Sequence, residues 1–341
     1  MIMPKIALLG TGAIGASVAR ALYLNKVPFD ILVRDDARKN ELIQNGISFS
    51  MKGALTRIPL METGDYRAIR IEQGGEYDYV LLGMKATHLP ASLNHAWKLA
   101  PNGRVVLLQN GLPEEVIQVT AQEAPRIVAG IVGYNVQLLP DGVFFQSNPG
   151  HLIFGTVPGQ ALATALKVAI EPWIPVIITD NGPGYRWNKL AINCVINGLG
   201  ALSGQTLGAI FANRAGRVGA IRILEETGTV MQHLGIKEEI VPGGLSVFKF
   251  GQKGSWPGFL QHLVLRILGM KYSKVKTSML QDIENKRATE VDAIQGAVVE
   301  AARKAKIPTP ILSEVVEKIR AIESGKAKPG AENLTALAGN S

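Results

Sequence analysis

Three polar residues recur at four-residue spacing near the middle of the chain. Lys189, Asn193 and Asn197 stand at positions i, i+4 and i+8 of an otherwise apolar segment. On an α-helix this spacing places all three side chains on one face. That face has two interpretations. It lines a cleft where the lysine gives a proton and the amides hold a polar ligand, or it is the polar edge of an ordinary amphipathic helix.

A carboxylate farther along the chain offers a partner for the lysine. The helical composition of residues 289–302 places Glu290 four positions before Ile294, in line with an apolar stripe. A buried carboxylate is costly unless it is paired, so Lys189 or a substrate hydroxyl is its expected partner. A lysine in a dry cleft has a lowered pKa and can protonate a developing alkoxide. The alternative is that Glu290 serves the dipole of a helix capped by Thr289.

Ser278 is a weaker candidate for a binding residue. With Gln281 three positions later, it fits a capping box at the start of a helix. On the spacing alone, we favour the capping role over a contact with substrate.

A glycine-rich motif near the start of the chain predicts a dinucleotide site. It follows an apolar run, predicted as a strand, and opens an Ala-rich stretch predicted as a helix. The first glycine permits a tight turn, the second lets the backbone approach a pyrophosphate, and the third lets the helix pack on the strand. Free N–H groups at the helix start attract phosphates. The residues expected to contact the cofactor are Gly10, Thr11, Gly12, Ala13, Ile14 and Gly15.

The choice of cofactor depends on the end of the second predicted strand, residues 28–34. Arg34 comes first there, where its guanidinium fork suits the 2′-phosphate of NADP(H). If the strand runs one residue longer, Asp35 or Asp36 becomes a ribose-binding acid and the cofactor is NAD(H). We favour NADP(H). Lys85, at the end of a later strand, is either a further cation near this phosphate or adenine, or a solvated strand-end lysine.

The pattern of segments predicts two domains. Strands alternate with helical stretches up to about residue 110, which indicates an α/β fold with an N-terminal Rossmann-type, doubly wound sheet. Residues 126–176 are β-rich, and we expect them to extend that sheet. The segment Asn181-Gly-Pro-Gly184 is a strong turn signal, and after it the composition becomes typical of helices. We therefore expect a nucleotide-binding domain over residues 1–181, an all-α domain over 182–328 and a loose tail over 329–341.

The composition narrows the class of protein. The 341 residues are 47% hydrophobic and 19% charged, which is typical of a globular protein. The longest apolar candidate, residues 259–270, is too short for a membrane span. The net charge of +8 comes without a nucleic-acid-binding motif, so it favours small anionic ligands. The single cysteine, Cys194, excludes an intrachain disulfide and a cysteine-cluster metal site, and we expect a cytoplasmic protein.

Seven segments follow one another along the chain in a characteristic order. They are Gly10–Gly15, Lys85, Gln109-Asn110-Gly111, Trp187–Asn193, Ser278–Asp282, Thr289–Asp292 and Ile307–Pro310. Taken in order, these motifs are similar to those of the ketopantoate reductase (2-dehydropantoate 2-reductase) family, and the likeness covers nearly the whole chain, from about residue 4 to 320. The resemblance implies NADPH-dependent reduction of a small 2-keto acid, 2-dehydropantoate, to the 2-hydroxy acid pantoate.

The resemblance also implies a role for each matching residue. Lys189 is then the general acid, and Glu290 positions it together with the substrate hydroxyl and contacts the cofactor. The cleft lies between the two domains, whose closure aligns the nicotinamide with Lys189. The remaining implied contacts are Asn110, Asn193, Asn197 and Ser278 for substrate, and Asn110, Arg34 and Lys85 for cofactor.

Two departures from the family pattern bear on the substrate. Leu207 stands where family members carry an asparagine that reaches the substrate, which favours a more apolar acceptor. The segment 241–272 is longer than usual, and its residues 256–268 form a lid, a homodimer contact or extra core, with the last two favoured. The alternatives to a ketopantoate reductase are therefore a paralogue acting on another 2-keto acid or related carbonyl, or a non-catalytic NADP(H)-responsive regulator.

Overall fold

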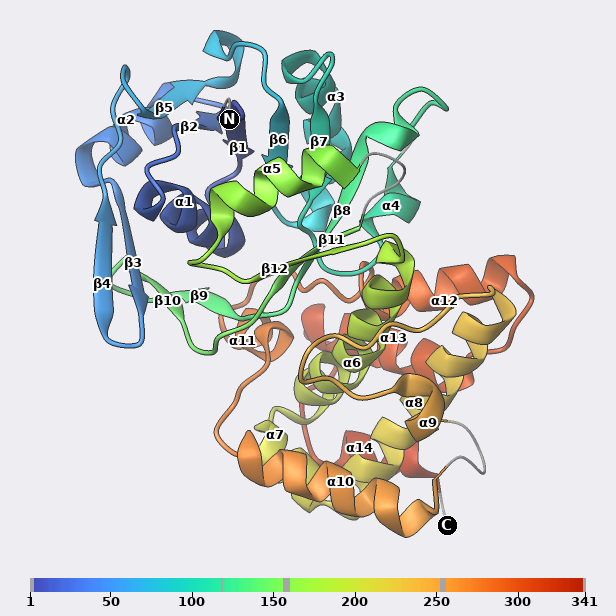
Figure 1. Ribbon diagram of the computed structural model, residues 1–341. Helices are drawn as coiled ribbons and strands as arrows, with labels where there is room; N and C mark the ends of the chain where they lie inside the picture. The colour runs from blue at the N-terminus through green and yellow to red at the C-terminus, as the bar shows by residue number, and fades with distance from the viewer. Residues whose placement is uncertain (1–2, 118, 156–159, 252–255, 340–341) are drawn as a thin grey trace. The chain divides into compact units, whose positions relative to one another are not determined.

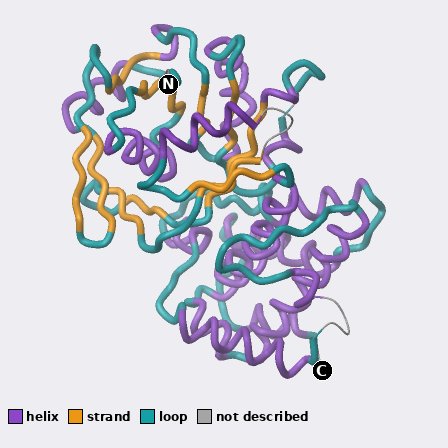
Figure 2. Tube along the Cα trace, in the orientation of Figure 1, coloured by secondary structure: helices purple, strands orange, loops and turns teal. Residues whose placement is uncertain are grey.

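The computed structural model describes residues 3–117, 119–155, 160–251 and 256–339. The chain divides into two compact units, residues 1–182 and 183–341. The first unit contains all of the strands of the described chain, and the second is built from helices (Figures 1 and 2). The α/β fold class is thus confirmed.

The first unit is organised by an eight-stranded sheet. Its strand order is β12-β11-β8-β7-β6-β1-β2-β5, and every neighbouring pair is parallel except β8 with β11. The strands are β1 (Ile6–Leu9), β2 (Phe29–Val33), β5 (Tyr66–Arg70), β6 (Tyr79–Leu82), β7 (Arg104–Leu107), β8 (Ile127–Val132), β11 (Leu152–Gly155) and β12 (Val176–Thr179).

Helices cover both faces of this sheet because its strands are apolar on both sides. Along β1, Ile6 and Leu8 belong to one core cluster, whereas Ala7 and Leu9 belong to the other. The first cluster includes residues of α1 and α5, and the second includes residues of α3. The helical segments of this unit are α1 (Ala13–Leu24), α2 (Asp36–Asn45), η1 (Ile71–Gln73), η2 (Ala86–His88), α3 (Leu89–Leu99), α4 (Pro113–Val116), η3 (Ala124–Arg126) and α5 (Gln160–Ile170).

A second sheet corrects the expectation for the β-rich region. Only β8, β11 and β12 extend the main sheet, and α5 lies among them. The strands β9 (Val136–Leu138) and β10 (Phe144–Gln146) instead join a four-stranded sheet of order β4-β3-β10-β9. Its other strands, β3 (Ile47–Met51) and β4 (Ala54–Ile58), form a hairpin whose two turn residues, Lys52 and Gly53, both have positive φ. Such a turn matches the twist of paired antiparallel strands.

The second unit consists of nine helices within the described residues. They are α6 (Gly182–Ser203), α7 (Leu207–Ala212), α8 (Arg214–His233), α9 (Val247–Gly251), α10 (Gly258–Lys271), α11 (Ser278–Glu284), α12 (Gln295–Lys304), α13 (Pro310–Glu323) and α14 (Glu332–Ala338). None of the helices in the described chain is long and apolar enough to cross a bilayer.

The expected loose tail is wrong over most of its length. Residues 332–338 form α14, whose Leu334 and Leu337 are fully buried. The Arg222 guanidinium on α8 donates to the Leu337 carbonyl at 2.6 Å. The tail was predicted to be loose because most of its residues are small or polar. Two of its apolar residues are nevertheless spaced i, i+3, so they lie on one face of a helix and pack together against α8.

Candidate active site

Helix α6 carries the expected polar face. Lys189 and Asn193 are half-buried and Asn197 is 4% exposed, while the intervening Cys194 and Val195 belong to the core. A solvent-facing edge would leave these amides exposed. The arrangement of the three side chains is therefore that of an inward-facing polar stripe.

Ser278 lies beside this stripe. Its hydroxyl donates to Asn197 Oδ1 at 3.3 Å, across 81 residues of sequence. The capping role expected for Ser278 is wrong, because the N-cap of α11 is Thr277, whose hydroxyl accepts from the Leu280 N–H at 3.4 Å. The helix begins one residue earlier than the spacing indicated, and this frees the Ser278 hydroxyl to face α6.

The electrostatics around Lys189 suit a proton donor. The pKa of its ammonium is lowered from 10.5 to about 7. Burial is the largest cause, the nearby positive charge of Arg186 acts in the same direction, and Glu290 acts in the opposite direction. Arg186 is itself buried and lies three residues before Lys189 on α6. An amine with a pKa near neutrality is present in both protonation states at physiological pH, as a general acid requires.

Glu290 reaches this region by a different local structure from the one expected. Glu290 lies at a bend, residues 291–294 form a turn, and the helix α12 begins only at Gln295. The Ile294 N–H donates to the Glu290 carbonyl at 2.9 Å, and the Thr289 hydroxyl accepts from the Val291 N–H at 3.1 Å. Glu290 is thus positioned by a hydrogen-bonded turn rather than by helical spacing.

Two residues near the stripe were not singled out from the sequence. One is Arg186, whose signal was its i−3 spacing from Lys189. The other is Gln295, which is fully buried and donates from Nε2 to the Cys194 carbonyl at 3.1 Å, so that it ties α12 to α6. The Cys194 side chain is fully buried, and burial raises the pKa of its thiol.

The glycine-rich loop has the geometry of a phosphate cradle. Gly10 has φ +97°, a conformation that favours glycine, and a Cβ on Gly12 would lie 3.0 Å from the Gly83 carbonyl oxygen. A Cβ on Gly15 would collide with the Gly10 carbonyl oxygen. Gly12 is the N-cap of α1 and supplies no side-chain acceptor, which leaves the first N–H groups of the helix for a ligand.

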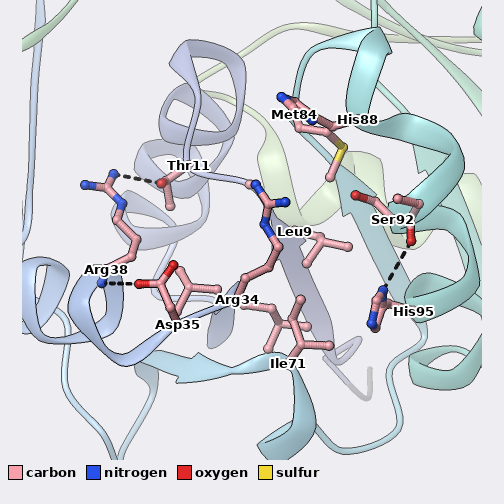
Figure 3. Close-up of a pocket in the computed structure, with 14 residues that line it drawn as sticks. Leu9, Thr11, Arg34, Asp35, Arg38, Ile71, Met84, His88, Ser92 and His95 are labelled. Atoms are coloured by element: carbon pink, nitrogen blue, oxygen red, sulfur yellow. Dashed lines mark hydrogen bonds between the residues drawn. The ribbon is translucent and has the colours of Figure 1, made fainter.

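A pocket of about 270 Å³ opens beside this loop, at the carboxyl ends of β1, β2 and β6 (Figure 3). This edge of a parallel sheet is where nucleotides bind in doubly wound folds. The pocket is lined by Leu9, Gly10, Thr11, Leu32, Val33, Arg34, Asp35, Arg38, Ile71, Met84, His88, Ala91, Ser92 and His95.

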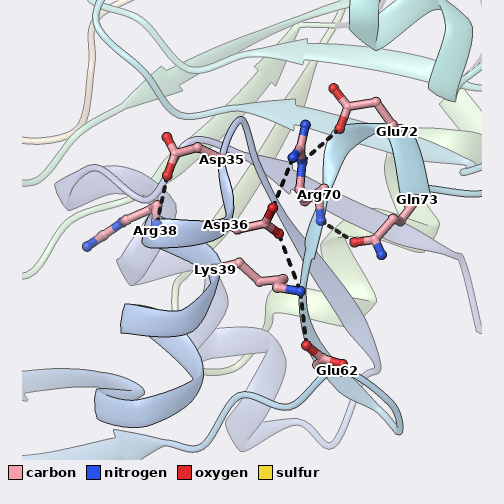
Figure 4. A network of polar contacts seen from close by, with 8 residues as sticks. All are labelled: Asp35, Asp36, Arg38, Lys39, Glu62, Arg70, Glu72 and Gln73. Atoms are coloured by element: carbon pink, nitrogen blue, oxygen red, sulfur yellow. Dashed lines mark hydrogen bonds and ion pairs between the residues drawn. The ribbon is translucent and has the colours of Figure 1, made fainter.

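Both acids that follow β2 have structural tasks. The strand ends at Val33, so that Arg34 is the first residue beyond it. The Asp35 carboxylate caps α2 by accepting from the Arg38 N–H at 2.8 Å. Asp36 pairs with Arg70 at 3.1 Å and with Lys39 at 3.5 Å in the network of Figure 4, and its hydrogen bond to Arg70 lowers its pKa.

Two further candidate cofactor residues of the first unit, Lys85 and Asn110, lie outside the pocket lining. Lys85 is exposed at the N-cap of η2, just after the pocket residue Met84. Asn110 is half-buried in the turn after β7, which Gln109 fastens by donating from Nε2 to the Leu82 and Met84 carbonyls at 2.9 and 3.1 Å. In the described chain, no group of three or more His, Cys, Asp or Glu side chains could hold a metal ion.

Comparison with known proteins finds relatives of both units. Residues 6–159 match the family model described as ketopantoate reductase PanE/ApbA, and residues 183–323 match its C-terminal counterpart. The chain is 26% identical to a 2-dehydropantoate 2-reductase of Mesorhizobium japonicum, over 94% of this chain and 99% of the relative.

Solved structures share the fold. The chain superposes on D-mandelate dehydrogenase with NADH and anilino(oxo)acetate with a TM-score of 0.75 and 18% identity, covering 94% of this chain and 99% of that one. It superposes on the dimeric ketopantoate reductase from Staphylococcus aureus with a TM-score of 0.71 and 21% identity, covering 95% and 100%.

The two units therefore define an oxidoreductase that acts on CH–OH groups. The chain belongs to the ketopantoate reductase family. A non-catalytic regulator, one of the alternatives that the sequence left open, is not supported by these matches.

Proposed function

We propose that the protein reduces 2-dehydropantoate to pantoate with NADPH. The observation that carries the proposal is the stripe of α6, on which a lysine with a pKa of about 7 shares a helix face with two amides. The glycine-rich loop and its pocket would hold NADPH, which would supply the hydride for the C2 carbonyl. Lys189 supplies the proton to the resulting alkoxide, so that ketone becomes alcohol and the amine is left neutral.

The neighbouring groups divide the remaining tasks. Asn193, Asn197 and Ser278 offer amide and hydroxyl groups for the substrate's hydroxyl and carboxylate, and the Ser278–Asn197 hydrogen bond holds two of them in fixed orientation. Glu290 keeps positive charge on Lys189 by opposing the effect of burial. The glycine loop and the adjoining pocket fit the phosphates and the adenosine end of a dinucleotide.

The test is steady-state oxidation of NADPH across a panel of 2-keto acids. We expect the highest kcat/KM for 2-dehydropantoate. A result in which this compound is among the poorest substrates would remove the proposed substrate while leaving the family assignment intact.

A second substrate class is favoured by one observation. Leu207 opens α7 and is only 6% exposed, so its side chain is a packing residue and presents no polar group. Loss of a hydrogen bond to a substrate hydroxyl weakens discrimination for substrates that carry one. If the enzyme is a paralogue for a more apolar 2-keto acid, the same panel will show a preference for aliphatic or aromatic keto acids without the hydroxyl.

The cofactor proposal rests on Arg34. The structural tasks of Asp35 and Asp36 support a pocket that receives a phosphate in preference to free ribose hydroxyls. For Arg34→Ala we expect weaker binding of NADPH with little change for NADH, measured by fluorescence titration. An equal loss for both cofactors would show that Arg34 does not contact the 2′-phosphate.

We also propose a homodimer contact on α10. Its inner face packs on α7 and α8, whereas Phe259 and Met270 on its outer face are 70% and 65% exposed, with Leu263 and Ile267 between them. A related enzyme of the same fold is dimeric. Sedimentation velocity should show a dimer that Leu263→Glu dissociates and that Leu138→Glu, at an exposed leucine of the first unit, preserves.

A further inference from the structure

A second arginine lies at the edge of the cofactor pocket. Arg38 belongs to the first turn of α2, where helices ordinarily favour acids. Its Nη2 donates to Thr11 Oγ1 at 2.8 Å, and its Nη1 pairs with Glu41 at 2.7 Å. Two contacts from different directions fix the guanidinium against the glycine-rich loop. Figure 3 shows Arg34 and Arg38 on either side of Asp35, both extending toward the loop that carries Thr11.

The pocket has an excess of positive charge. The lining residues include two arginines, Arg34 and Arg38, but a single acid, Asp35. Asp35 already accepts the N–H at the start of α2. Glu41 pairs with Arg38 from outside the lining. A ligand that carries a dianionic group would neutralise this excess, whereas a ligand with only ribose hydroxyls would bring no negative charge to the two guanidinium groups.

We infer that Arg38 is a second specificity-determining residue, which binds the 2′-phosphate of the cofactor together with Arg34. The inference rests on the proposed function, because it presupposes NADPH. A phosphate presents three acceptor oxygens, and a single guanidinium fork engages two of them at most. Arg34 and Arg38 approach from separate elements, the end of β2 and the first turn of α2, so the two forks share the oxygens.

Thr11 has a positioning role in this arrangement. It belongs to the loop that receives the pyrophosphate, and its hydroxyl holds the Arg38 guanidinium there. Binding of the pyrophosphate and recognition of the 2′-phosphate are therefore coupled through one side-chain hydrogen bond. Thr11→Val keeps the size and removes the hydrogen bond, so it should lower the preference for NADPH without removing either cation.

The test is the ratio of the Kd for NADH to the Kd for NADPH, measured by fluorescence titration. We expect Arg38→Ala to lower this ratio about tenfold, Arg38→Lys to lower it less, and Arg34→Ala/Arg38→Ala to bring it close to one. Arg57→Ala, at an exposed arginine of the same unit outside the pocket, is the charge-matched control and should preserve the ratio.

The outcomes separate the two proposals. A wild-type ratio well above one that Arg38→Ala leaves unchanged would overturn the inference and leave the proposed cofactor standing. A wild-type ratio close to one would overturn the proposed cofactor, and the role of Arg38 with it. If Arg38→Ala and Arg57→Ala lower the ratio equally, the effect arises from the overall positive charge of the surface and not from a contact with the 2′-phosphate. That result would also overturn the inference.

Discussion

The protonation of Lys189 should set the pH dependence of catalysis. Its pKa of about 7 means that the fraction carrying the reactive proton falls about tenfold for each pH unit above neutrality. Between about pH 6 and about pH 9, we therefore expect kcat/KM for keto acid reduction to fall on the order of a hundredfold. The assay is NADPH oxidation at low keto acid concentration, because kcat/KM reports the pKa of the enzyme before substrate binds.

Two neighbouring charges allow this reasoning to be tested in both directions. Glu290→Gln removes the charge that raises the pKa of Lys189, so the midpoint of the profile should move to lower pH. Arg186→Met removes a charge that lowers the pKa, so the midpoint should move to higher pH. Opposite displacements would be difficult to obtain from general damage to the site. A flat profile, or displacements in the same direction, would refute the role of Lys189 as the acid.

The same pKa shift predicts an effect on stability. A lysine whose pKa is lowered on folding binds its proton more tightly in the unfolded chain. Its presence therefore destabilises the fold fully below about pH 7, and this cost fades as the pH rises toward 10.5. Lys189→Met should raise the free energy of unfolding by roughly a few kcal/mol near pH 6 and by much less near pH 10, measured by urea denaturation.

Further predictions concern the loop, the acid and the C-terminal helix. Gly15→Ala should abolish cofactor binding or destabilise the first unit, because its Cβ would meet the Gly10 carbonyl; Gly75→Ala, where the Cβ meets nothing, is the control in cofactor titration and thermal melting. Lys189→Ala should reduce turnover roughly 100-fold or more with NADPH affinity kept, and unchanged turnover would exclude it as the acid. Leu334→Ala should cost about 2–5 kcal/mol in urea unfolding; a loss below about 1 kcal/mol would mean that α14 adds little to the fold.

The nucleotide-binding part of the first unit was predictable because the same glycines that the local turn requires are also required for the packing of helix on strand. The glycines at 10, 12 and 15 are needed where the strand, the turn and the helix meet, so the motif marks all three at once. The polar stripe of α6 was predictable for a similar reason, since one helical period specifies its face. In both cases, the spacing of residues within a segment of fewer than ten positions is enough to specify how their side chains or backbone groups are arranged.

What was missed depends on contacts between distant segments. The pairing of β3 with β10 joins residues about a hundred positions apart, and neither strand specifies that partner locally. The seven-residue α14 is too short to be stable by itself and owes its existence to burial against α8. Glu290 illustrates a third case. The residue was correctly singled out, but the turn that positions it was taken for helix because its apolar spacing resembled a helical stripe.

The burial of Cys194 has a practical consequence for measuring motion in this enzyme. The chain has one thiol, which is fully enclosed beside the polar stripe and held as the unreactive protonated form. The native protein should therefore resist alkylation and oxidative cross-linking. Cysteines introduced at the surface would be the sole reactive thiols, so a pair of spectroscopic labels, one on each unit, could follow the separation of the two units through a catalytic cycle without any background to remove.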